Sequence, residues 1–181
     1  ACLIMGNSLA AVTPTTYCGT SGVITLDGGS VTPAGGTYTW EYSLNNAPFA
    51  AASGTNSTED YQTPNLSTGN HRYRRVYFLN EDPPCYDTSN VVQFVVNPTP
   101  AVPGLSASPN PNCLGTVVSL TATGAVGATY TWTASSVNAG LVNTMANTAT
   151  INPIVIGTYT ITVTQTVTGC TSNPVTLTTM T

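Results

Sequence analysis

Few side chains in this chain could take part in acid–base chemistry. The carboxylates are Asp27, Glu41, Glu59, Asp60, Glu81, Asp82 and Asp87. Four of them form two adjacent pairs, Glu59–Asp60 and Glu81–Asp82, in segments that read as loops. Hydrolysis of a glycosidic bond needs two carboxyl groups that face each other across a cleft, and loop neighbours seldom do so. Glu81, Asp82 and Asp87 have the oxygen ligands that calcium takes, but we prefer a solvated loop as their interpretation.

The other candidates for catalysis are as sparse. His71 is the only histidine, and no G-x-S-x-G or H-E-x-x-H motif accompanies it. We expect His71 to be exposed beside the neighbouring arginines. The sequence therefore predicts no enzyme, no catalytic residue, no metal site and no cofactor.

Three arginines gather in one predicted strand. Arg72, Arg74 and Arg75 are the only Lys or Arg residues, and the formal net charge is −4. Nucleic acid is not an expected partner, because binding phosphates needs several spread cations. The three arginines could contact an acidic glycan or a neighbouring subunit, so we treat them as a candidate interaction strand. The alternative, which we prefer, is that they guard the strand against edge pairing.

Five cysteines indicate an oxidising compartment with disulfides. Their positions repeat along the chain, which predicts the pairs Cys18–Cys85 and Cys113–Cys170. Cys2 is then left unpaired within this segment. The sequence contains no C-x-x-C motif, which would have indicated metal binding or redox catalysis instead.

An internal repeat organises these residues. The motif TYTW occupies residues 37–40 and again residues 129–132, and a tyrosine-bearing strand and a cysteine follow each copy. Each copy closes with a Ser-Asn strand, at Ser89-Asn90 and Ser172-Asn173. The mid-strand aromatic residues of the two copies are predicted to lie in two hydrophobic cores: Trp40, Trp132, Tyr73 and Tyr159.

Short alternating strands separated by Gly, Pro and Asn turns predict an all-β chain of two tandem Ig-like antiparallel β-sandwiches. We place domain 1 at residues 14–97, a Pro-rich linker at 98–103 and domain 2 at 104–181. Residues 1–13 parallel the closing strands of both copies, with cysteines 83 and 85 residues apart. They are therefore predicted to be the closing strand of a preceding repeat, or a strand donated to another subunit.

The order Cys, Trp, Tyr, Cys is similar to that of Ig-like domains, but here the cysteines flank their strands, so a bridge would clip the ends of the sandwich. Both copies resemble the Ig-like and PKD-like modules of giant Bacteroidota surface proteins. The residues that carry the resemblance are CLGTVVSLTAT (113–123), TYTW (129–132), GTYTITVT (157–164), Gly169-Cys170, WEYS (40–43), YRRV (73–76) and CYDTSNVV (85–92). Such proteins are exported by the type IX system and serve as adhesins, gliding filaments or accessory arrays on secreted enzymes.

The resemblance implies a non-catalytic structural segment of a large extracellular, cell-surface filament, used for attachment or gliding. Its expected partners are adjacent repeats, copies of the same protein, or a surface glycan or other cell-surface partner. The sequence contains no run of 18 apolar residues, so it predicts no membrane span. Two alternatives stay open. One is a carbohydrate-binding module with an aromatic row from Tyr38, Tyr42, Tyr61 or Tyr86; the other is a fibre subunit joined by strand donation.

Overall fold

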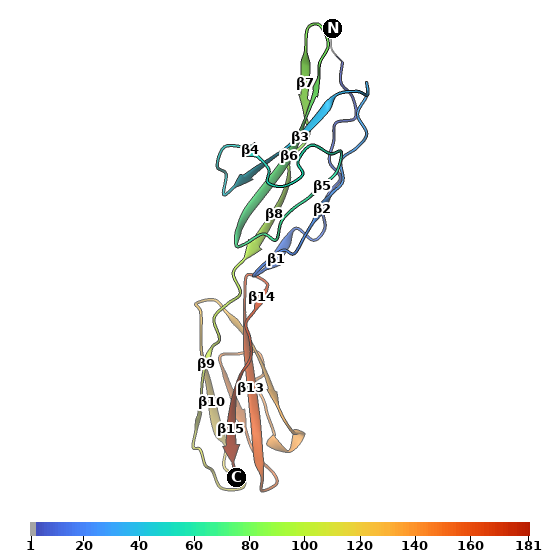
Figure 1. The fold of residues 1–181 in the computed structure, drawn as a ribbon. Coiled ribbons are helices and arrows are strands. Elements are labelled where there is room, and N and C mark those ends of the chain that lie inside the picture. The colour runs from blue at the N-terminus through green and yellow to red at the C-terminus, as the bar shows by residue number, and fades with distance from the viewer. Residues whose placement is uncertain (1–2) are drawn as a thin grey trace. The chain divides into compact units, whose positions relative to one another are not determined.

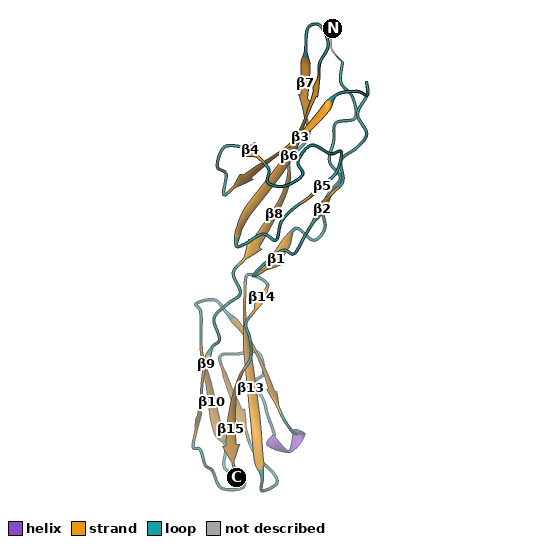
Figure 2. Ribbon diagram, viewed as in Figure 1, coloured by secondary structure: helices purple, strands orange, loops and turns teal. Residues whose placement is uncertain are grey.

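The computed structural model describes residues 3–181 and divides into two compact units, Ala1–Pro98 and Thr99–Thr181. Both units are built from β-strands, with one three-residue 3₁₀ helix, η1 (Val137–Ala139), in unit 2 (Figure 2). The prediction of an all-β chain of sandwich units is confirmed. The unit boundary falls where the predicted Pro-rich linker begins.

Unit 1 contains two sheets (Figure 1). The larger sheet has the order β1-β8-β6-β3-β4, and β7 also pairs with β6; the smaller sheet pairs β2 with β5. The strands are β1 (Thr16–Cys18), β2 (Thr25–Leu26), β3 (Thr37–Leu44), β4 (Ala50–Ala51), β5 (Tyr61–Gln62), β6 (Gly69–Leu79), β7 (Cys85–Thr88) and β8 (Val92–Asn97). One pair departs from the predicted antiparallel pattern, since β1 runs parallel to β8.

The alternation of β6 decides what unit 1 buries. His71, Tyr73, Arg75, Tyr77 and Leu79 are all buried, while the residues between them are partly or fully exposed. Successive side chains of a strand point to opposite faces. The apolar residues of this inward row, Tyr73, Tyr77 and Leu79, belong to hydrophobic clusters of unit 1. The β3 partner strand contributes Trp40, which is fully buried.

Residues 3–13 lie within unit 1, although we set them apart from domain 1 on the basis of sequence. Met5 bridges Thr32 and Leu9 bridges Gly28, both antiparallel. Leu9 is part of the core cluster and is only 7% exposed. This segment therefore packs on the unit that follows it in the same chain.

Unit 2 has a three-stranded sheet of order β12-β10-β9 and a sheet in which β13 pairs with β11, β14 and β15. Its strands are β9 (Gly104–Ser108), β10 (Val118–Thr123), β11 (Thr129–Ala134), β12 (Thr148–Ile151), β13 (Thr158–Val167), β14 (Cys170–Thr171) and β15 (Val175–Met180). Trp132, Tyr159, Ile161 and Val163 belong to a core separate from that of unit 1.

The two tryptophans occupy matching environments. Trp40 donates its indole N–H to the Thr58 carbonyl at 2.9 Å, and Trp132 donates to the Ala146 carbonyl at 2.7 Å. The backbone N–H of each tryptophan also bonds a carbonyl of the loop segment that covers it, at Asn56 and Thr144. The repeated TYTW motif thus marks the strand that joins each core to a long polar connection.

Candidate functional site

The candidate interaction strand divides between two faces of the β6 sheet. Arg75 is 0% exposed and points into unit 1, whereas Arg72 and Arg74 lie on the outer face. The prediction of one shared arginine surface is therefore wrong for Arg75. Arg75 shares the parity of Tyr73 and Tyr77 along the strand, and this alternation in the sequence is the signal that identifies it as an interior residue.

Arg75 is held by neutral oxygen atoms. Its guanidinium donates Nε to Asn7 Oδ1 at 3.0 Å, one terminal nitrogen to the Glu59 carbonyl at 2.7 Å and the other to the Gly29 carbonyl at 2.6 Å. Its charge also lies 4.7 Å from the ring centroid of Tyr38. Burial lowers the pKa of Arg75, and the surrounding Tyr38 and carboxylates partly oppose that effect. Buried charge needs such partners to be tolerated, so Arg75 is an internal tie between β6, two loops and the N-terminal segment.

Unit 2 has a neutral counterpart of this residue in Gln165. The backbone N–H of Arg75 bonds Ser89 Oγ at 2.8 Å, and that of Gln165 bonds Ser172 Oγ at 3.1 Å. Gln165 is 2% exposed; it donates to the Ala101 carbonyl at 2.6 Å and accepts from the Ala125 N–H at 2.9 Å. The Ser-Asn dipeptide that repeats in sequence therefore marks a connection whose serine hydroxyl binds the backbone of a long buried polar residue in each unit.

Arg72 and Arg74 enclose a phenylalanine on the outer face. The guanidinium carbons lie 5.2 and 4.1 Å from the ring centroid of Phe49. Arg74 also forms an ion pair with Glu41 at 2.6 Å, with both side chains partly exposed. Glu41 thus balances the charge of Arg74 within unit 1. Arg72 is the more open cation of the two arginines.

His71 is buried, contrary to the expectation from sequence. It is 1% exposed and stacks beside Tyr42 with a centroid separation of 5.8 Å. Its Nε2 lies 2.8 Å from the Ser67 carbonyl, which can only accept, so Nε2 carries the proton. Nδ1 then accepts from the Tyr42 hydroxyl at 2.8 Å. Both ring nitrogens are satisfied by structural partners.

The predicted disulfide pairs do not form. Cys113 is a free, exposed thiol while Cys170 is disulfide-bonded, so the pair Cys113–Cys170 is wrong. Cys18 and Cys85 are also disulfide-bonded, but they lie at opposite ends of the large sheet. Cys18 aligns with Asn97 beside the Gly69 end of β6, and Cys85 aligns with Leu79 at its other end.

Ten residue steps along β6 span roughly 30 Å at about 3.3 Å per residue, whereas bonded cysteines need Cα atoms within about 7 Å. The pair Cys18–Cys85 is therefore excluded within unit 1. Cys2 lies outside the described residues.

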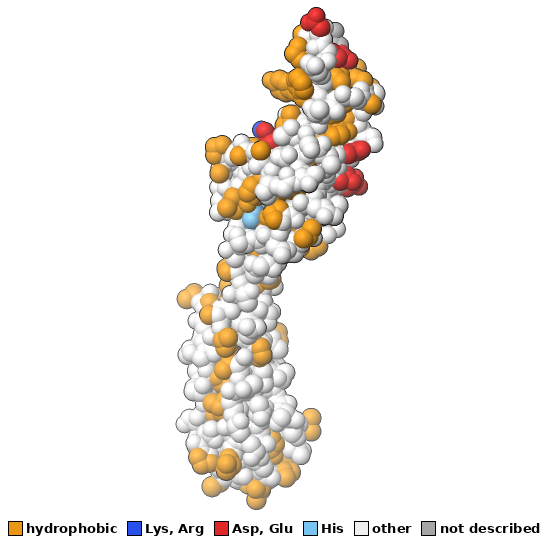
Figure 3. Space-filling model, in the orientation of Figure 1, with side chains coloured by type: hydrophobic (Ala, Val, Ile, Leu, Met, Phe, Trp, Pro, Cys, Tyr) orange, Lys and Arg blue, Asp and Glu red, His pale blue; other side chains and the backbone are white. Residues whose placement is uncertain are grey.

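The ionised side chains all belong to unit 1, and the visible acidic groups in Figure 3 lie on that unit. Within residues 3–181, no three His, Cys, Asp or Glu side chains come together as a metal would require. Asp60 instead accepts from the Gly28 N–H and Glu59 from the Ser30 hydroxyl, both at 2.9 Å. These carboxylates organise loops around Arg75.

The predicted aromatic row is not a continuous surface. Tyr61 is only 2% exposed, Tyr38 and Tyr42 are partly buried, and Tyr86 is 75% exposed. Tyr86 lies opposite Phe78 on the outer face of β6 and β7. The structure thus separates Tyr42 from Tyr86.

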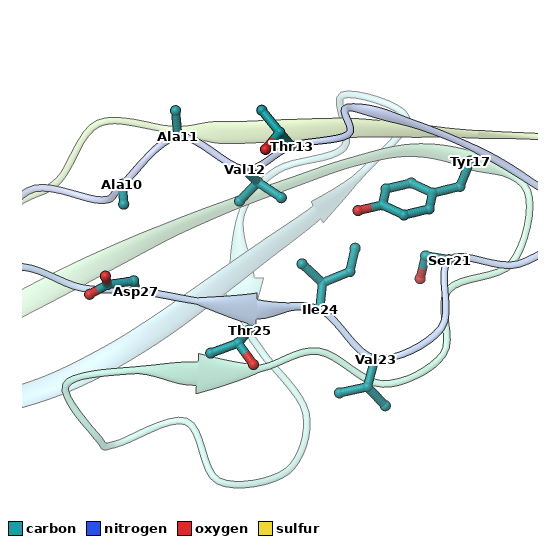
Figure 4. Close-up of a pocket in the computed structure, with 10 residues that line it drawn as sticks. All are labelled: Ala10, Ala11, Val12, Thr13, Tyr17, Ser21, Val23, Ile24, Thr25 and Asp27. Carbon is teal, nitrogen blue, oxygen red and sulfur yellow. The ribbon is translucent and has the colours of Figure 1, made fainter.

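A groove lies beside the N-terminal segment, between residues 10–13 and 21–27 (Figure 4). Its volume is about 390 Å³. Val12 and Ile24 point into it, and the hydroxyl of Tyr17 lies at one side (Figure 4). Ala10 and Asp27, which both line the groove, are joined by a bond from the Ala10 N–H to the Asp27 carbonyl.

Solved structures with the same fold include domains A168–A170 of titin, with a TM-score of 0.58, 16% identity, and coverage of 96% of this chain and 65% of that chain. Another is the mouse coronavirus receptor-binding domain complexed with its murine receptor, with a TM-score of 0.51, 15% identity, and coverage of 97% and 98%. At these identities the likeness shows an Ig-like sandwich fold alone. No curated protein sequence matches.

The part of the chain that the structure describes contains no helix with the length and hydropathy needed to cross a bilayer. A family model matches residues 6–98, which make up more than half of the chain and correspond to unit 1 with most of its N-terminal segment. The chain therefore belongs to the family described as "Domain of unknown function (DUF8696)".

Proposed function

We propose that this chain is a non-catalytic structural segment of a larger extracellular filamentous protein, such as an adhesin, stalk or gliding filament of the cell surface. The repetition of one internal design carries the proposal. Each unit has its own core, a tryptophan hydrogen-bonded to a covering loop, and a buried polar residue whose backbone N–H binds the serine of a Ser-Asn pair. Repeating units that bury their own cores suit a mechanical spacer.

Three further features support this proposal. Cys18, Cys85 and Cys170 are disulfide-bonded, and disulfides persist in oxidising, extracellular compartments. Prolines at positions 98, 100 and 103 fall at the unit boundary and stiffen the connecting segment. The resemblance to Bacteroidota surface modules adds export by the type IX system to the proposal.

The experiment is the intact, non-reduced mass of the native polypeptide, with its location determined by surface protease treatment of whole cells. A mass far above 18.6 kDa, with peptides of this chain released from the surface, is the expected result. A polypeptide of about that mass from which the protease releases no peptides at the cell surface would contradict the proposed role in a larger surface protein.

Strand donation between subunits is the second candidate. Asn7 and Leu9 already bind unit 1 of their own chain, which favours an intrachain role for this segment. The two candidates differ in solution, because strand donation predicts concentration-dependent oligomers held together by residues 3–13, and an intrachain segment predicts none.

A further inference from the structure

A small pocket opens at one edge of unit 1, between the β3–β4 side of the large sheet and the segment at residues 64–67. Its volume is about 300 Å³, within the range of small-molecule sites. We propose that this pocket binds a neutral saccharide unit, such as a terminal hexose or N-acetylhexosamine of a surface glycan.

The inner wall of the pocket is aromatic. Tyr42, His71 and Tyr73 all contribute to its lining. Tyr42 lies 4.9 Å from Tyr73 and 5.8 Å from His71 between ring centroids. The hydrogen bonds from Tyr42 to His71 and from His71 to the Ser67 carbonyl hold the rings in place. Tyr42 is the partly exposed ring of the three, and the buried His71 and Tyr73 pack against it. An aromatic ring held rigidly in this way is suited to the C–H face of a pyranose ring, because it offers contact area at low entropic cost.

The rim of the pocket is polar and available. Ser53, Asn65 and Ser67 are exposed and line the opening. Among the described residues, the hydroxyls of Ser53 and Ser67 and the amide of Asn65 make no hydrogen bond to protein. An amide both donates and accepts, so Asn65 can engage two neighbouring hydroxyl groups of a sugar.

The charge of the lining selects among ligands. No Asp, Glu, Lys or Arg lines the pocket, and Arg75 is buried in contacts with Asn7, Gly29 and Glu59. Phosphates, carboxylates and amines would lose hydration without a compensating charge. An entirely apolar ligand would leave the polar rim unpaired. A neutral polyhydroxyl ligand satisfies both the aromatic wall and the rim.

This inference does not depend on the proposed mechanical role, since a stalk can exist with or without a ligand. The test is a titration of the ¹⁵N-labelled full chain with glucose, galactose, mannose and N-acetylglucosamine, each at millimolar concentration. We expect at least one sugar to give saturable amide shifts centred on residues 42, 51–53, 65–67 and 71. Glucuronate and glucosamine are charged probes and are expected to bind no better than their neutral counterparts.

Variants make the assignment specific. Asn65→Ala removes an exposed rim amide, and we expect it to weaken binding about tenfold without unfolding the unit. Asn80→Ala is the matched control, because Asn80 is exposed just beyond the other end of β6, and its affinity should equal that of the wild type. The proposal is overturned if no sugar gives saturable shifts, if the shifts centre on Phe78 and Tyr86, or if both variants bind alike.

Discussion

Asn7 and Arg75 are hydrogen-bonded at 3.0 Å, from Nε to Oδ1, across 68 residues of sequence. The same Asn7 donates its amide N–H to the Asp87 carbonyl at 2.9 Å. Asn90 adds a reciprocal contact, because its Oδ1 accepts from the Leu9 N–H at 2.7 Å and its Nδ2 donates to the Leu9 carbonyl at 3.2 Å. These bonds fasten the N-terminal segment to the strands of unit 1.

Replacing Asn7 tests this fastening. Asn7→Ala leaves Arg75 Nε and the Asp87 carbonyl without their partner, and hydrogen bonds to charged groups contribute about 1.5–3 kcal/mol. We expect the free energy of unfolding of unit 1 to fall by about 2 kcal/mol, measured by hydrogen exchange of β6 and β8 amides. Ser8→Ala, at the exposed neighbouring position, should change it by less than about 0.5 kcal/mol. Equal protection in both variants would show that the Asn7 contact contributes little.

Gln165 should play the corresponding part in unit 2. Gln165→Leu leaves the Ala101 carbonyl and the Ala125 N–H unpaired, and each buried orphan group costs about 1–3 kcal/mol. We expect faster exchange of β11 and β13 amides with unit 1 unaffected. Asn173→Ala, whose side chain is exposed, serves as the control; an equal loss in this variant would argue against a specific role for Gln165.

Alkylation before and after reduction tests which cysteines are free and which are disulfide-bonded. Cys113 should react with iodoacetamide in the native, non-reduced protein, because it is free and exposed. Cys18, Cys85 and Cys170 should react only after reduction. A non-reduced peptide map should contain neither a Cys18–Cys85 nor a Cys113–Cys170 link, and the appearance of either would contradict the structure.

Alkaline pH should destabilise unit 1. Burial raises the pKa of Tyr73 above its ordinary value of 10.0, and burial also raises the pKa of Tyr42 and Tyr38. At these tyrosines the unfolded chain binds fewer protons than the folded one above about pH 10, so their contribution to stability is constant below that pH and falls as pH rises further. Urea unfolding at pH 8 to 11 measures the slope. Tyr73→Phe should reduce it, and Tyr86→Phe, with a 75% exposed ring, should not.

Much of the fold could be predicted from strand parity. Alternation in residues 69–79 and 158–167 fixes which side chains share a face, and Trp40, Trp132, Tyr73 and Tyr159 are all buried. The same parity places Arg75 on the face of Tyr73. The clustering of three arginines in the sequence, however, suggested that they act together. The alternation of the strand instead turns Arg75 toward the interior, away from Arg72 and Arg74.

The saccharide pocket could not be predicted in the same way. Tyr42 and Tyr73 share a sheet, but Ser53, Asn65 and Ser67 come from loops whose path depends on what they cover. Local pattern carries no information on the closure of such loops. His71 was misplaced for a related reason, because its two partners, Tyr42 and Ser67, are brought to it only by the folded sheet and loop.

The sequence by itself determined the repeat, the all-β class and the inward face of each long strand, because these follow from a period-two pattern that is local to each strand. The tertiary structure alone decided which cysteines can meet, that residues 3–13 belong to unit 1, and that Arg75 is buried and hydrogen-bonded inside it. Those outcomes depend on contacts such as Asn7–Arg75, which join distant parts of the chain. Spacing along the chain does not encode distance across a sheet, and so matched cysteine positions did not predict bonded pairs.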